Sequence, residues 1–188
     1  MSKKDFYAFT HITKEGGLFS AIITPGFSSP PHLPEEMKDI EPTPTKQLWD
    51  TGATNCAITS SLVKKLKLTP IGKTEVTYGG GSEETYVHLI HVFLPNNVLI
   101  RNIQVTECND GKGVFDMIIG MDVITTGDFS VTNVNGNTVV SFRTPSTEKI
   151  DYVKEANIIK SLASRKAFTG RKGQKYTHPK KKRKKRRR

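Results

Sequence analysis

One aspartate in this sequence is placed where a carboxylate could do chemistry. Asp50 ends a short β-rich segment, residues 46–49, and is followed at once by a tight Thr-Gly turn at residues 51–52. This arrangement presents a carboxylate at a strand end with backbone N–H donors beside it. The tripeptide alone is a weak signal, because any given tripeptide occurs by chance in roughly a few per cent of chains of this length. Read by itself, Asp50 is a turn aspartate, so its context decides.

A second motif and a hairpin supply that context. Residues 115–122 read Phe-Asp-Met-Ile-Ile-Gly-Met-Asp, so two isoleucines and a glycine precede a short helix predicted over 121–125. Between the motifs, strands predicted at 74–78 and 85–93 are joined across the glycine-rich, polar segment 79–84. By itself that tip is an ordinary loop. Its neighbours indicate a mobile hairpin over a site.

The other predicted elements are mostly β-strands. Residues 6–12 and 18–23 are β-rich runs separated by two glycines, which predicts an N-terminal hairpin. Six prolines within residues 25–45 predict a long surface loop. Asn-Gly at 135–136 predicts a two-residue hairpin turn. Further strands are predicted at 46–49, 98–105, 114–119, 129–134 and 138–142, and further helices at 60–68 and 148–166.

These features in this order resemble a known family. Residues 48–54 (Leu-Trp-Asp-Thr-Gly-Ala-Thr), the glycine-tipped hairpin and Ile-Ile-Gly-Met-Asp at 118–122 resemble the retropepsins and their cellular and bacterial relatives. The bacterial branch is the most similar, because a helix follows the first motif and Gly-Asp-Phe-Ser-Val-Thr-Asn at 127–133 follows the second. The resemblance covers roughly residues 6–145. It implies a mainly β fold, a retropepsin-like acid-protease barrel subunit with one or two short helices.

Three segments are predicted along the chain. Residues 1–147 form the retropepsin-like protease domain, including the proline-rich loop 25–45. Residues 148–168 form a C-terminal helix with apolar side chains roughly on one side. Residues 169–188 form a disordered basic tail, because nothing there can bury enough apolar surface to offset the ordering entropy.

The resemblance implies aspartic protease chemistry, in which two carboxylates share one proton. The sequence has one Asp-Thr-Gly and no internal repeat, so the second catalytic Asp50 must come from another copy, in a two-fold homodimer. The implied supporting roles fall to Thr51, which hydrogen-bonds across the dimer; Gly52, whose N–H approaches the carboxylate; the flap and substrate-binding residues Tyr78, Gly79, Gly80 and Gly81; and the scaffold residues Ile118, Ile119 and Gly120, which pack behind the catalytic loop.

Ala53 completes the active-site loop and departs from the family pattern, since many relatives carry serine at this position. A serine hydroxyl that donates a hydrogen bond to a carboxylate favours its charged form, and alanine cannot donate. We therefore expect a less acidic pH optimum than in serine-bearing relatives.

Other chemically suggestive residues have simpler explanations. Asp116 and Asp122 fit a turn and a helix start better than catalysis. His88 and His91 are three apart in a predicted strand and should point to opposite faces, which makes a poor metal pair. Cys56 reads as a buried free thiol, because no histidine near it in sequence could activate it. We expect no metal and no cofactor.

The net charge of +11 is concentrated at one end of the chain. From Arg165 onward there are 14 Lys/Arg and no Asp/Glu, so the other 15 Lys/Arg against 18 Asp/Glu leave residues 1–164 at −3. Nine consecutive cations at 180–188 predict nonspecific nucleic acid contact or a merely solvated tail. Two cysteines and no run of 18 apolar residues predict a soluble, cytoplasmic protein without a membrane span. Residues 179–184 resemble a nuclear localisation signal, so the basic tail predicts a nuclear location if the source is a eukaryote.

The sequence therefore predicts a homodimeric aspartic endopeptidase that hydrolyses peptide bonds in extended protein or peptide substrates. The alternative is a noncatalytic dimerisation module of the same fold that presents two basic tails to nucleic acid.

Overall fold

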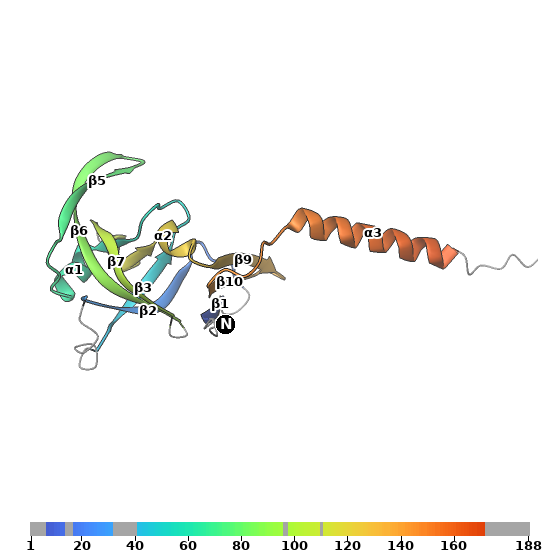
Figure 1. Ribbon diagram of the computed structural model, residues 1–188, viewed down its shortest axis with the longest axis horizontal. Coiled ribbons are helices and arrows are strands. Elements are labelled where there is room, and N and C mark those ends of the chain that lie inside the picture. Colours follow the sequence, from blue (N-terminus) through green and yellow to red (C-terminus); the bar gives the residue numbers. More distant parts are fainter. Residues whose placement is uncertain (1–6, 14–16, 32–40, 96–97, 110, 172–188) are drawn as a thin grey trace, which may run out of the picture. The chain divides into compact units, whose positions relative to one another are not determined.

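The structure is a computed structural model that describes residues 7–13, 17–31, 41–95, 98–109 and 111–171. It divides into two compact units, Met1–Thr147 and Glu148–Arg188. The first unit is mainly β and carries two short α-helices, α1 (Ser60–Lys65) and α2 (Met121–Ile124) (Figure 1). The predicted fold class, a mainly β acid-protease barrel with few short helices, is confirmed.

Six strands of the first unit close into a barrel. They follow the order β2-β3-β8-β4-β7-β6, and a further pairing between β2 and β6 completes the ring. The seventh strand, β5, pairs with β6 beyond the ring, and together they arch away from the barrel in Figure 1. The strands are β2 (Ile23–Ser29), β3 (Thr43–Trp49), β4 (Ala57–Thr59), β5 (Gly72–Tyr78), β6 (Gly81–Leu94), β7 (Val98–Cys108) and β8 (Met117–Ile119).

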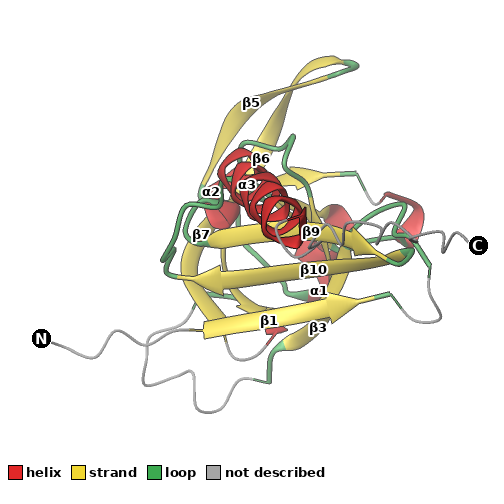
Figure 2. Ribbon diagram, turned by 90° about the vertical axis from the view of Figure 1, so that its right-hand side faces the viewer, coloured by secondary structure: helices red, strands yellow, loops and turns green. Residues whose placement is uncertain are grey.

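A second sheet is built from the two ends of this unit. Its order is β1 (Tyr7–Ile12), β10 (Asn137–Thr144) and β9 (Asp128–Val134), all antiparallel (Figure 2). Asn135 and Gly136 join β9 to β10 with φ angles of 55° and 76°. Both values lie in the left-handed region that a two-residue hairpin turn requires, so the predicted turn is confirmed.

The predicted N-terminal hairpin is wrong. Residues 18–23 mostly precede β2, which begins at Ile23 and pairs with β3 and β6, while β1 pairs with β10. The predicted loop 25–45 is also shorter, because Pro25 and Pro44 lie within β2 and β3. A proline removes only one donor from a strand, and long-range pairing overrides that local signal. Residues 32–40 of the loop lie outside the described part of the chain.

The glycine-rich hairpin is tighter than predicted. Tyr78 pairs with Gly81, so the turn consists of Gly79 and Gly80 alone, and the polar residues 82–84 belong to β6. Cross-strand polar contacts hold them in the sheet, such as Lys73 Nζ with Glu84 Oε1 at 2.8 Å.

Trp49 joins the two sheets through an aromatic cluster. Its ring lies 5.7 Å from Phe9, 5.3 Å from Phe142 and 5.3 Å from Phe129, which it stacks at 5°. The indole Nε1 donates to Thr24 Oγ1 at 2.9 Å, so its polar atom is also satisfied. Because Trp49 is the last residue of β3, this cluster fixes the strand end that carries Asp50. The barrel core includes Ile58, Ile90, Val92, Val105, Met117 and Ile119.

In its described part, the second unit contains one helix, α3 (Tyr152–Arg171), where the sequence predicted 148–166. Several large apolar side chains on it are exposed, among them Val153 and Ile159. No helix within the described residues is both long enough and apolar enough to cross a membrane. The rest of the predicted tail, residues 172–188, lies outside the described residues.

Asp128 ties the end of β10 to the start of β9. Its carboxylate accepts hydrogen bonds from the Ser146 hydroxyl at 2.5 Å, from the Thr147 N–H at 3.0 Å and from Arg143 Nε at 2.6 Å. These three donors favour the charged form and hold the pKa of Asp128 well below its usual range.

A pH-dependent contribution to stability follows from Asp128. Since its pKa is lower in the folded than in the unfolded chain, the stabilisation is fully present above the unfolded value of about 3.9 and decreases as pH falls below it. We expect Asp128→Asn to lower the free energy of unfolding at pH 7, with a deficit that is smaller at pH 3 and is lost only as pH falls through the folded-state pKa. Urea unfolding of both proteins at the two pH values measures this; an equal deficit at both would contradict it.

Candidate active site

Asp50 lies directly after β3, and the backbone around it holds it firmly. Its N–H donates to Ile119 O at 3.0 Å, and the Gly52 N–H donates to Asp50 Oδ1 at 2.8 Å. The Ala53 N–H donates to Asp50 O at 3.2 Å, which closes the turn. Asp50 is half-buried. One carboxylate oxygen is therefore fixed by a backbone donor and the group still reaches solvent.

The second motif lies against this loop. β3 and β8 pair in parallel, with Trp49 opposite Ile119. Beyond β8, the Met121 N–H donates to Ala53 O at 2.8 Å and the Asp122 N–H donates to Thr54 O at 3.1 Å. The loop that carries the aspartate is thus hydrogen-bonded residue by residue to the start of α2.

Cys56 and Asp122 add a side-chain link between the same segments. Asp122 accepts from the Cys56 N–H at 2.9 Å and from Cys56 Sγ at 3.0 Å, and the Gly120 N–H donates to that sulfur at 3.2 Å. Cys56 is fully buried, and this burial raises the pKa of its thiol well above the usual range. The thiol is therefore a neutral donor that secures the loop and is a poor nucleophile.

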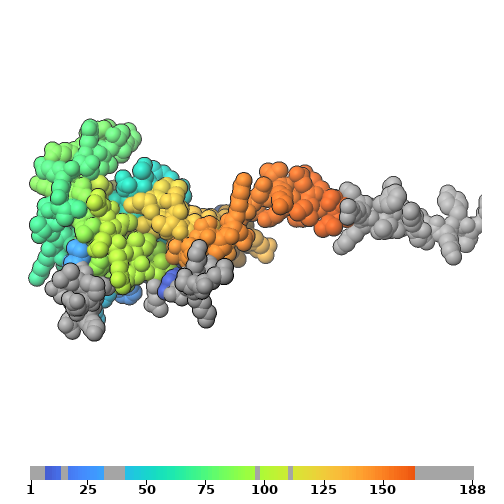
Figure 3. All heavy atoms as spheres, in the orientation of Figure 1, coloured from blue at the N-terminus to red at the C-terminus, as the bar shows by residue number. Residues whose placement is uncertain are grey.

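A cleft of about 860 Å³ lies between this loop and the β5–β6 hairpin. In Figure 3 the hairpin overhangs a hollow above the segment that carries the aspartate. Of the predicted site residues, those that line the cleft are Asp50, Gly52, Ala53, Tyr78, Gly79 and Ile118. Asp50, its loop and one face of the β5–β6 hairpin thus line the same cleft.

The other predicted residues lie around the cleft without lining it. Thr51 is exposed beside the loop, and Gly80 and Gly81 form the far side of the hairpin turn. Ile119 and Gly120 are buried behind the loop. Residues that the sequence did not indicate also line it, among them Asn55, Glu83, Glu107 and Phe115. Adjacency to the Asp-Thr-Gly motif could have suggested Asn55, whereas Glu107 comes from β7 and depends on the sheet order.

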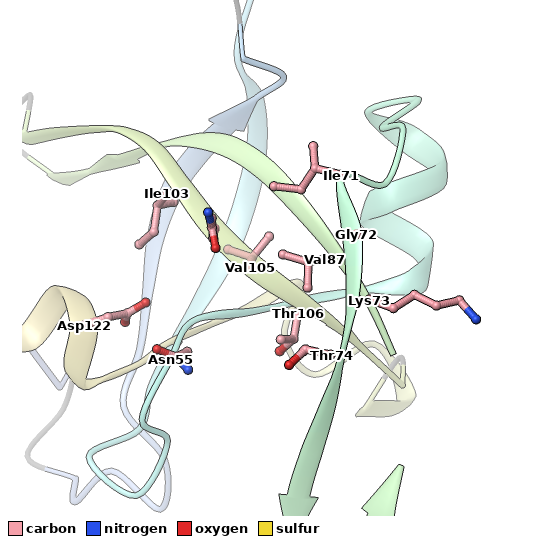
Figure 4. Close-up of a pocket in the computed structure, with 11 residues that line it drawn as sticks. Asn55, Ile71, Gly72, Lys73, Thr74, Val87, Ile103, Val105, Thr106 and Asp122 are labelled. Carbon is pink, nitrogen blue, oxygen red and sulfur yellow. The ribbon is translucent and has the colours of Figure 1, made fainter. Parts of the chain in front are cut away.

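A second cavity of about 510 Å³ adjoins the cleft (Figure 4). It shares Asn55, Thr74 and Thr106 with the cleft but not Asp50. Asp122 on α2 also lines it, and its carboxylate is already engaged by Cys56. This cavity lies beside the candidate site and is not part of it.

Two histidines of the barrel, His88 and His91, have structural partners. His88 Nε2 lies 3.2 Å from Glu107 Oε2, and His91 Nδ1 accepts from the Asn102 N–H at 3.1 Å. Both rings are buried. Over the residues described, no group of three or more His, Cys, Asp or Glu side chains is arranged to hold a metal ion.

Comparison with known protein families shows which family the sequence around this site resembles. Residues 38–123 match the aspartyl protease family, and that segment contains Asp50, the hairpin and the Gly120 motif. The resemblance to retropepsin-like aspartic proteases is thereby confirmed, and the protein has an aspartic protease fold. Whether the bacterial branch is the most similar stays a prediction.

Solved structures of aspartic proteases are similar to this one at low sequence identity. A retropepsin-like aspartic protease from Rickettsia conorii is 15% identical with a TM-score of 0.44, covering 77% of this chain and 99% of that one. EIAV protease in complex with the inhibitor HBY-793 is 21% identical with a TM-score of 0.41, covering 57% and 88%. A Legionella pneumophila protein of unknown function is 17% identical with a TM-score of 0.30, covering 53% and 84%. Comparison with curated protein sequences gives no significant match.

Proposed function

We propose that this protein is a homodimeric aspartic endopeptidase whose catalytic dyad consists of Asp50 from each subunit. The observation that carries the proposal is one half-buried carboxylate, fixed by the Gly52 N–H, in a cleft beneath a glycine-turned hairpin. The aspartyl protease match over residues 38–123 supports the same chemistry.

Hydrolysis needs two carboxylates with different protonation. The charged one takes a proton from a water molecule, whose oxygen attacks the carbonyl carbon of the scissile peptide bond. The protonated one gives its proton to the carbonyl oxygen, and the tetrahedral intermediate then collapses as the amine leaves with a proton from the dyad. Two carboxylates in contact cannot both be charged, because like charges repel, so the pair holds one proton between them. A single pair therefore supplies both the acid and the base.

The second carboxylate comes from a second copy. Each chain has one Asp-Thr-Gly, and the exposed Thr51 is available to hydrogen-bond across a two-fold axis. In the second sheet, β1-β10-β9, the strands β1 and β9 each have one neighbouring strand among the described residues. Val131 and Val134 on β9 are 39% and 66% exposed. An edge strand with unpaired backbone groups can pair with the same strand of another copy. We therefore place the dimer contact on this sheet.

The β5–β6 hairpin acts as the flap in this proposal. An extended peptide lies between it and the catalytic loop, where backbone hydrogen bonds supply affinity and side-chain pockets supply specificity. Tyr78 and Gly79 line the cleft, and Gly80 and Gly81 complete the turn and allow it to move. Closure excludes water from the dyad.

The remaining segments have subordinate roles. We assign the protease domain to residues 1–147 and treat the helix α3 (Tyr152–Arg171) and the basic segment that follows it as appendages without a part in hydrolysis. The alternative function, two basic tails presented to nucleic acid, depends on residues 180–188, which lie outside the described residues. No observation favours it over hydrolysis.

Incubation with an unfolded protein tests the proposal. New peptide termini should be detected by mass spectrometry between about pH 4 and 7, where a dyad can hold one proton. A statine-type peptide, which mimics the tetrahedral intermediate, should block their formation, and a metal chelator should not. Cleavage that resists the statine peptide would point to another mechanism.

Ala53 sets the pH range of this activity. Its N–H closes the turn at Asp50 O, and it lines the cleft, but its methyl group cannot donate to the dyad. In Ala53→Ser the added hydroxyl favours the charged carboxylate, so the acidic limb of the kcat profile should move toward lower pH by about half a unit. A pH-rate profile that stays in place or moves toward base contradicts this expectation.

A further inference from the structure

The cleft contains acidic residues in addition to Asp50. Besides Asp50, three glutamates are among the residues that line it, Glu75, Glu83 and Glu107. Glu75 pairs with Glu84 across the hairpin and shares its face, so Glu83 and Glu107 are the two whose side chains face the cleft. No Lys, Arg or His occurs among the described residues that line this space. In a two-fold dimer each carboxylate would be present twice, so the potential in the cleft would be strongly negative.

The position of Glu107 is fixed by contacts with two neighbouring residues. It lies near the end of β7, and its side chain is 22% exposed. His88, whose side chain is 2% exposed, contacts Glu107 Oε2 through Nε2 at 3.2 Å. The Thr85 hydroxyl donates to Glu107 O at 2.7 Å and fixes the backbone as well. A carboxylate positioned by a buried ring loses little side-chain freedom when a cation binds it.

Glu83 faces the same space from the hairpin. It pairs across the strands with Val76, which also lines the cleft, and the Tyr78 hydroxyl lies 3.4 Å from Glu83 Oε2. The next residue, Glu84, does not line the cleft and pairs with Lys73. Adjacent residues of a strand point to opposite faces of the sheet. Glu83 therefore faces the cleft, whereas Glu84 is neutralised by Lys73 on the other face.

We propose that the cleft selects extended peptides that carry Lys or Arg near an apolar scissile pair. This inference rests on the proposed function and names its substrate class. Glu83 and Glu107 receive the cationic side chains, and apolar lining residues such as Phe115 and Ile118 receive the side chains at the scissile bond. Neutral lining residues could not distinguish cationic from acidic peptides, whereas these carboxylates attract the first and repel the second.

Three matched peptides test this substrate class. They share one apolar centre and differ only in two flanking residues, which are Lys, Gln or Glu. Each is made in a cleavable form, for kcat/KM, and in a statine form, for Kd. We expect the Lys peptide to have about a tenfold higher kcat/KM and about a tenfold lower Kd than the Gln peptide, and the Glu peptide to have the lowest kcat/KM and the highest Kd. The Lys preference should shrink between 50 mM and 500 mM salt, because these carboxylates are partly solvated.

Two variants and a matched control locate the preference. Glu83→Gln and Glu107→Gln should each reduce the Lys-to-Gln ratio about threefold. Glu84→Gln removes the same charge from the neighbouring position outside the cleft and should leave the ratio unchanged. Equal binding of the three statine peptides by the wild type, or an equal loss of preference in Glu84→Gln, would overturn the proposal. Statine peptides that bind with the Lys preference but cleavable ones that stay intact would support the acidic cleft and refute the proposed hydrolysis.

Discussion

Replacing Asp50 with asparagine should reduce kcat/KM for peptide hydrolysis by about a thousandfold or more. An asparagine keeps the shape of the side chain and can still accept the Gly52 N–H at its Oδ1 position, so the loop should keep its conformation. What it lacks is the ability to take a proton from water. The measurement is kcat/KM for a fluorogenic peptide, with circular dichroism to verify the fold.

Asp116→Asn is the matched control for this substitution. Asp116 precedes β8 and its carboxylate accepts from the Lys46 N–H at 2.7 Å, but it does not line the cleft. The same chemical change there should leave hydrolysis within about threefold of wild type, because it removes charge without touching the dyad. If both variants lose activity alike, the effect is structural; if Asp50→Asn keeps a tenth of the activity, Asp50 is not the catalytic group.

Mixing the two proteins shows whether one site uses two chains. Random exchange of equal amounts of wild-type and Asp50→Asn subunits gives about one quarter wild-type dimers, one half mixed dimers and one quarter variant dimers. Because a mixed dimer holds a single aspartate, specific activity per wild-type chain should fall by about half. A site contained within one chain would show no such fall.

The second large effect is expected at Gly120. A Cβ atom built on this residue would lie 2.5 Å from Asn55 C and 2.6 Å from Asn55 O, both backbone atoms that cannot rotate away. Since the Gly120 φ is −91°, the requirement is for space and not for an unusual backbone conformation. Gly120→Ala must therefore push the catalytic loop away from α2. We expect a loss of about 3 kcal/mol in the free energy of unfolding, and kcat should fall with it.

A thermal melt measures this cost, which corresponds to a decrease in Tm of roughly 10 °C for a unit of this size. Gly72→Ala is the comparison, since nothing lies within 4 Å of its added Cβ at the start of β5. That variant should melt within about 2 °C of wild type. A Gly120→Ala protein as stable as Gly72→Ala would mean that the loop does not need this close approach.

The sequence predicted the elements whose signals are local. Asn135 and Gly136 specify their turn by backbone conformation alone, and a strand running into Asp50 was evident from residues 46–49. The failures arose where partners are distant. Residues 18–23 looked like a strand paired with 6–12, but the strand begins at Ile23 and pairs with β3 and β6. Propensity describes one strand, whereas pairing depends on the whole barrel.

The site divides in the same way. Motif order indicated Asp50 and the hairpin, and the structure brings both to the cleft. The bond between Cys56 and Asp122 was not foreseen, because it joins residues 66 positions apart and each looked like an ordinary core or helix-start residue. Glu107 was missed because β7 reaches the cleft through its pairings with β4 and β6, which are distant in sequence from Asp50. Charge that is contributed by a distant strand leaves no local signal.

Sedimentation combined with activity on the same samples tests most directly whether two chains form one site. Over a dilution series we expect the specific activity to decline in proportion to the fraction of dimer, because a chain with a lone Asp50 has no second carboxylate to polarise the carbonyl. Full specific activity in a sample that sediments as a single chain would contradict the account.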